Sequence, residues 1–116
     1  MSSSVAPQLI IDAHLDLAWN ALSWNRALHL TVEELRPSEA GIEGKSRGRN
    51  TVSFPAMRAG RIGVSLVTLL ARANPKGRSI LDYRSQEIAS AAAQGQLAWY
   101  HLLEERGICR MIGDLP

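Results

Sequence analysis

Cysteines, aromatic residues and long apolar runs are all scarce in this 116-residue sequence. Its single cysteine, Cys109, excludes an internal disulfide, and the mostly apolar segment 108–112 around it predicts a buried, unreactive thiol. No run approaches the roughly 18 apolar residues that a membrane span needs. The first residues also lack the basic and apolar regions of a signal peptide. We therefore expect a soluble cytoplasmic protein that does not bind membranes.

A strong excess of one charge is also absent, since 13 Lys and Arg residues face 11 Asp and Glu residues. The one basic cluster, Lys45, Arg47 and Arg49, lies among Gly and Ser with no aromatic residue between them. Nucleic-acid binding needs clustered cations beside aromatic stacking residues. The Gly-Lys-Ser at 44–46 lacks the glycine that a phosphate-binding loop requires five residues earlier, where Glu39 stands. We expect no nucleic-acid partner.

The hydrophobic content of 46% is typical of a globular domain, and its pattern alternates between strands and helices. The predicted strands are 9–11, 62–71 and 108–112. The predicted helices are 17–28, 31–36, a turn around 54–58 that ends at Gly60, and a long helix from about Ser79 or Asp82 to Arg106. Such alternation predicts an α/β fold with a parallel sheet. The continuous apolar run at 62–71 predicts a strand buried on both faces.

The short helix at 31–36 has recognisable ends. Thr31 and Glu34 have the spacing of a capping box, and Pro37 is expected to end the helix. The residues from 37 to 50 are rich in Gly, Ser and charge, which predicts a loop.

The long helix is bounded by two N-cap candidates, Ser79 and Asp82, and by Gly107 at its C-terminal end. Apolar or small residues at helical spacing predict the face that packs. These residues are Leu81, Ile88, Ala92, Gly95, Trp99 and Leu102.

The segment Asp-Ala-His-Leu-Asp at 12–16 carries the chemistry. In extended chain, Asp12, His14 and Asp16 project to one face just past an apolar strand, where α/β folds place ligand sites. An imidazole beside a carboxylate suits zinc, so His14 and Asp16 are the predicted metal ligands. Asp12 is the predicted outer partner that orients the His14 ring. His29 and His101 are expected to be surface or packed residues, and no residue is assigned a catalytic role.

Three segments resemble one family. Residues 11–17, Ile-Asp-Ala-His-Leu-Asp-Leu, are similar to the strand-one signature of the membrane (renal) dipeptidases, Asp-Gly-His-Asn-Asp-Leu or close variants. Residues 53–64 resemble the family's short helix and second strand. Residues 82–97 and 17–22 resemble a bacterial branch. The resemblance extends in register from about Leu9 to Ile112.

The resemblance implies an amidohydrolase-type (β/α)₈ TIM barrel with two zinc ions and a dipeptide substrate. Residues 1–116 would form its N-terminal portion, about three strands with their helices, and His14 and Asp16 would bind the more buried metal. The family's bridging glutamate and further histidines are expected beyond residue 116, so we expect a fragment that is inactive alone. Unpaired sheet edges predict aggregation, homo-oligomerisation or marginal stability.

Two alternatives stay open. One is another amidohydrolase-type barrel that acts on a cyclic amide or lactone. The other is a small non-catalytic α/β module in which the His-x-Asp is structural, because this pattern is common and a zinc site needs three or four ligands.

Overall fold

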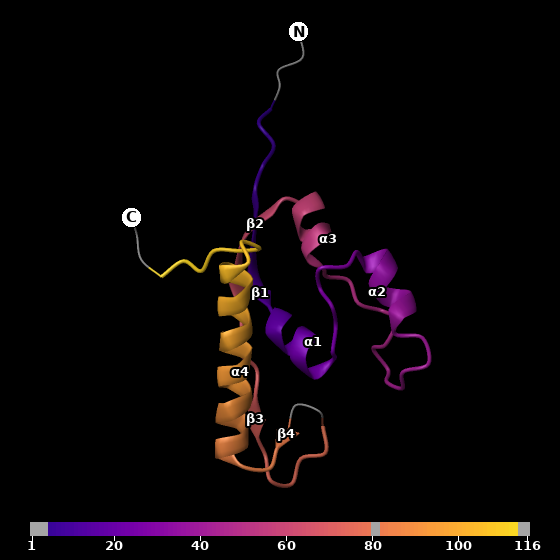
Figure 1. Cartoon of the computed structure of the whole chain (residues 1–116), viewed down its shortest axis with the longest axis vertical. Coiled ribbons are helices and arrows are strands. Elements are labelled where there is room, and N and C mark those ends of the chain that lie inside the picture. Colours follow the sequence, from indigo (N-terminus) through magenta and orange to yellow (C-terminus); the bar gives the residue numbers. More distant parts are fainter. Residues whose placement is uncertain (1–4, 80–81, 114–116) are drawn as a thin grey trace. The chain divides into compact units, whose positions relative to one another are not determined.

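The computed structural model describes residues 5–79 and 82–113 and confirms a mixed α/β structure. The elements in chain order are β1 (Ile10–Leu15), α1 (Leu17–Ser23), α2 (Val32–Ser38), α3 (Phe54–Ala59), β2 (Ile62–Val67), β3 (Arg72–Ala73), β4 (Asp82–Tyr83) and α4 (Gln86–Glu105) (Figure 1). They divide into two compact units. Unit 1 is Met1–Leu15 with Arg26–Leu66, and unit 2 is Asp16–Asn25 with Val67–Pro116. The strands pair as β1 with β2 and β3 with β4, and the described residues form no closed barrel.

In unit 1, β1 and β2 lie side by side (Figure 1). The backbone N–H of Ile10 donates to the carbonyl of Arg61 at 2.8 Å, which joins the beginnings of both strands. The two strands therefore run in the same direction, as the parallel-sheet prediction requires. β1 is longer than the predicted strand at 9–11, so that His14 lies within it.

The prediction that the second strand is longer and buried on both faces is wrong. β2 ends at Val67 instead of residue 71, and Val64 and Leu66 are 39% and 63% exposed. Ile11 on β1 is also 69% exposed. Within the described residues this sheet has two strands, and burial on both faces would require other elements packed above and below it.

The capping box of α2 is confirmed. The Thr31 hydroxyl accepts from the backbone N–H of Glu34 at 3.2 Å, and the Glu34 carboxylate accepts from the backbone N–H of Thr31 at 2.9 Å. This second bond lowers the pKa of Glu34. Pro37 does not end the helix, which continues to Ser38. Proline lacks the N–H that would donate to the carbonyl four residues earlier, so α2 has one intrahelical hydrogen bond fewer.

α3 confirms the predicted helical turn and contributes Phe54 to the core of unit 1. The buried hydroxyl of Ser53 accepts from the backbone N–H of Ala56 at 3.3 Å and caps the helix. The backbone N–H of Phe54 donates to the carbonyl of Leu28 at 2.8 Å. Leu28, Phe54 and Leu35 of α2 are buried and supply the apolar core of this unit.

A buried ion pair organises the loop that follows α2. The Glu39 carboxylate accepts from Arg26 Nε at 2.6 Å, from the Gly48 backbone N–H at 2.6 Å and from Arg47 Nη1 at 3.4 Å. Arg26 also donates to the carbonyl of Ser46 at 2.8 Å. The loop at 37–50 is irregular apart from the end of α2, as predicted, but Glu39 fixes its course.

In unit 2, α1 is shorter than the predicted helix at 17–28 and ends at Ser23. Asn25 has a φ of 51°, in the left-handed region that stops a helix. Asparagine and serine have low helix propensity, so Asn20, Ser23 and Asn25 outweigh the periodic apolar positions.

The predicted beginnings of α4 at Ser79 or Asp82 are wrong. Ser85 is the N-cap residue, and its hydroxyl accepts from the backbone N–H of Ile88 at 3.2 Å. Asp82 lies instead in β4, which pairs in parallel with β3. Its carboxylate accepts from Arg72 Nε and from the backbone N–H of Ser79. Asp82 therefore closes a turn, which is a common alternative use of a residue type that also caps helices.

The C-terminal end of α4 is as predicted, but the strand after it is not. Gly107 has a φ of 72°, and its N–H donates to the carbonyl of Glu104 at 2.9 Å. The predicted strand at 108–112 is irregular and pairs with no other described strand. The backbone N–H of Met111 donates to the Glu104 carboxylate at 2.6 Å. Cys109 is exposed, contrary to the prediction.

The packed face of α4 differs from the predicted apolar face. Ile88 and Leu102 are 49% and 48% exposed, and Leu81 lies outside the described residues. The buried residues of α4 are Ala89, Gln96, Tyr100 and Leu103. Gln96 and Tyr100 are polar, so the spacing of apolar residues predicts an adjacent face of α4 instead of the buried one. Within the described residues, no helix has the length and apolar content to cross a membrane.

Candidate metal centre

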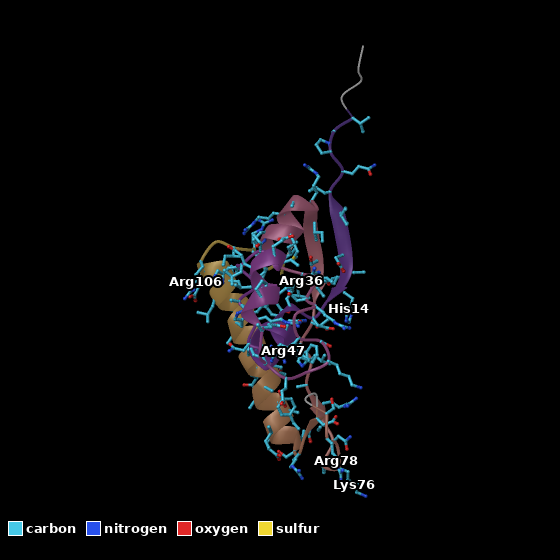
Figure 2. The ribbon with its side chains drawn as sticks, turned by 90° about the vertical axis from the view of Figure 1, so that its right-hand side faces the viewer. His14, Arg36, Arg47, Lys76, Arg78 and Arg106 are labelled. Carbon is cyan, nitrogen blue, oxygen red and sulfur yellow. The ribbon has the colours of Figure 1, made fainter. Side chains whose placement is uncertain are left out.

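The predicted site begins on β1. Figure 2 labels His14, which is exposed, while Asp12 is half-buried. The Asp12 carboxylate accepts from the backbone N–H of His14 at 3.0 Å. Asp12 therefore contacts His14 through the main chain, and its predicted bond to the His14 ring stays a prediction.

Asp16 lies just before α1, in the N-cap position, and is half-buried. Its carboxylate does not cap the helix but accepts from the hydroxyl of Thr68 at 2.5 Å. Its backbone carbonyl accepts from both the backbone N–H of Asn20 at 3.1 Å and Asn20 Nδ2 at 2.9 Å. Thr68 thus binds the side chain of Asp16, and Asn20 binds its main chain. His14 belongs to unit 1 and Asp16 to unit 2, with Leu15 between them in the chain.

Two buried polar side chains of α4 bind the segment that contains Thr68. The Tyr100 hydroxyl donates to the carbonyl of Thr68 at 3.0 Å and accepts from the backbone N–H of Ala18 at 3.1 Å. Gln96 binds both backbone groups of Leu70. Its Nε2 donates to the Leu70 carbonyl at 2.8 Å, and its Oε1 accepts from the Leu70 N–H at 2.7 Å. Burial, and to a smaller extent the charge of Asp16, raises the pKa of Tyr100.

Thr68, Gln96 and Tyr100 were not identified from the sequence. The available signal is the spacing of Gln96 and Tyr100, which places two polar groups one turn apart on α4. Both are nearly inaccessible, at 1% and 3% exposure, and buried polar groups of this kind require hydrogen-bond partners.

The donor types of this site fit zinc, but their number is too small. His14 supplies an imidazole nitrogen and Asp16 a carboxylate, whereas zinc sites use three or four ligands. Across residues 5–79 and 82–113, no group of three or more His, Cys, Asp or Glu side chains is arranged to hold a metal. His29 and His101 are exposed. The described residues therefore offer half a site at most.

No family model, curated protein or solved structure matches this chain. The resemblance to the membrane dipeptidases is consequently a prediction that depends on the quoted segments alone.

Proposed function

We propose that this chain supplies the first metal ligands, His14 and Asp16, of a zinc-dependent hydrolase that cleaves dipeptides. The observation that carries the proposal is the location of this pair. His14 lies near the end of β1, Asp16 follows that end, and the Asp16 carboxylate is hydrogen-bonded to Thr68, the first residue after β2. Ligand sites of α/β folds lie at this edge of parallel strands.

Each residue has a distinct part in this proposal. A neutral His14 ring offers one nitrogen to the metal, and Asp16 offers a charged oxygen. The Thr68 hydroxyl donates to Asp16 Oδ1, and the second carboxylate oxygen, Oδ2, is the one proposed to bind the cation. The chemistry that zinc supplies in such hydrolases is activation of water and polarisation of the scissile carbonyl. The remaining ligands, and a second zinc ion, belong to parts of a barrel outside this sequence.

Zinc titration of the chain tests the ligand pair. In ¹H–¹⁵N spectra of the imidazoles and ¹³C spectra of the carboxylates, we expect zinc to shift His14 and Asp16. His14→Ala and Asp16→Asn should each abolish the response of the other residue. His101→Ala is the matched control, because His101 is exposed, and it should change nothing. A titration that leaves both predicted ligands unshifted, in the chain alone and also when it is joined to the remaining barrel strands, would contradict the metal assignment.

A test of the substrate class requires a protein in which this sequence is joined to the remaining barrel strands. We expect zinc-dependent release of free amino acids from a panel of dipeptides, with loss of at least 100-fold in kcat/KM for His14→Ala. Hydrolysis of a cyclic amide or a lactone in place of dipeptides would instead identify another amidohydrolase-type barrel.

A non-catalytic α/β module is the second candidate function, and one observation favours it. Asp12 and Asp16 each accept a hydrogen bond from a neighbouring group, the His14 backbone and the Thr68 hydroxyl. Both carboxylates could therefore serve the fold alone. This candidate predicts a cooperative thermal transition of the monomer at a Tm that zinc does not change, measured by circular dichroism.

A further inference from the structure

We propose that Thr68 is a positioning residue that sets the direction of the Asp16 carboxylate, and that Tyr100 and Gln96 of α4 hold Thr68 in place for this purpose. The metal-binding purpose rests on the proposed function, whereas the positioning of Asp16 can be measured without any metal. All four residues belong to unit 2.

Thr68 is bound at both its side chain and its main chain. Its hydroxyl donates to Asp16 Oδ1, and its carbonyl accepts from the Tyr100 hydroxyl at 3.0 Å. A threonine hydroxyl on a fixed main chain has few directions available, because its χ1 angle is restricted by β-branching. The Thr68 hydroxyl therefore presents a defined donor to Asp16.

The main chain beyond Thr68 is fixed by a second contact with the same helix face. The Gln96 carboxamide makes two hydrogen bonds to the backbone of Leu70, at 2.7 and 2.8 Å. Gln96 and Tyr100 are four positions apart, so they lie one above the other on α4. The segment between β2 and β3 is therefore held to α4 at two positions, Thr68 and Leu70.

Tyr100 also connects this segment to the start of α1. Its hydroxyl accepts from the backbone N–H of Ala18, two residues after Asp16. One side chain thus holds the chain on both sides of the contact between Thr68 and Asp16. A ligand held in one rotamer loses less conformational entropy when it binds a metal, and loss of such outer partners typically weakens metal binding by about 10- to 100-fold.

The first experiment uses the metal-free chain. Couplings from Asp16 Cγ to its backbone nitrogen and carbonyl carbon report the χ1 rotamer of Asp16 by NMR. We expect one rotamer in the unmodified chain and in Thr68→Ser, and averaging over rotamers in Thr68→Val. Thr51→Val is the matched control, because Thr51 is exposed and lies in unit 1. Averaged couplings in the unmodified chain, or unchanged couplings in Thr68→Val, would overturn the proposal.

The second experiment measures zinc affinity by NMR titration of the same variants. We expect Thr68→Val to weaken binding about 10- to 100-fold and Thr68→Ser to restore it to within about threefold. Tyr100→Phe, which removes a single oxygen, should also weaken binding, and it decides the question if Thr68→Val does not fold. Equal affinity in all variants would refute the positioning role while leaving the ligand assignment intact. No zinc binding by the unmodified chain, either alone or joined to the remaining barrel strands, would refute the proposed function, and the couplings of Asp16 would still decide the positioning.

Discussion

Replacement of Glu39 by glutamine removes the charge at the centre of the buried ion pair. Glu39 is 4% exposed and Arg26 is 8% exposed, and the two are joined by hydrogen bonds of 2.6 and 3.3 Å. Glutamine preserves the shape of the side chain but leaves the Arg26 guanidinium without a countercharge. Breaking a buried pair in this way is strongly destabilising.

The magnitude follows from the pKa of Glu39, which is lowered from 4.5 to about 2. The hydrogen bond from Arg26 is the largest cause, followed by the bond from the Gly48 backbone and the charges of Arg26 and Arg47, whereas burial acts in the opposite direction. Since each pKa unit corresponds to about 1.4 kcal/mol, the interactions of the charged Glu39 carboxylate together contribute up to about 3 kcal/mol. Because the folded-state pKa is the lower one, this contribution is complete above pH 4.5 and is lost as the pH falls towards 2.

Urea unfolding followed by circular dichroism between pH 7 and pH 2 measures this contribution. We expect Glu39→Gln to be less stable by about 3 kcal/mol at pH 7 and the two curves to converge as the pH falls from 4.5 towards 2. Glu43→Gln is the control, since Glu43 is exposed on the same loop. Parallel curves, or a carboxyl titration of Glu39 near pH 4.5 by ¹³C NMR, would refute the reasoning.

Two further substitutions test helix ends through the free energy of unfolding in urea. Thr31→Ala removes the capping box of α2 and should cost about 1 kcal/mol, whereas Thr51→Ala, at an exposed loop position, should cost almost nothing. Equal effects would mean that the cap contributes no stability. Gly107→Ala places a side chain at a φ of 72° and should cost about 1 kcal/mol more than Gly113→Ala. If Gly107→Ala is neutral, the helix does not depend on this left-handed residue.

Local signals in the sequence predicted local structure well. The capping box at Thr31 and the glycine after α4 depend on groups within a few residues, so their spacing is sufficient. The start of α4 was misplaced because Asp82 and Ser85 are equally good cap residues, and pairing between β3 and β4 decides between them. The segment at 108–112 has the composition of a strand, but a strand also needs a partner.

In the candidate site, too, the local pattern was predictable from the sequence and the long-range contacts were not. Asp12, His14 and Asp16 are close in the chain, so their alternation is visible in the sequence. The contact of Asp16 with Thr68 spans 52 residues, and that of Tyr100 with Ala18 spans 82. The contact of Tyr100 with Ala18 also uses a main-chain atom, so no complementary residue type in the sequence indicates it.

The carboxamide of Gln96 takes the place of a peptide group from a neighbouring strand. It offers one donor and one acceptor to the N–H and carbonyl of Leu70, as an adjacent β-strand would. The N–H and carbonyl of Leu70 are therefore already hydrogen-bonded to a side chain of α4 and do not pair with a strand among the described residues. Because this contact uses only main-chain atoms of residue 70, it would tolerate any residue there except proline, whereas residue 96 must keep its amide.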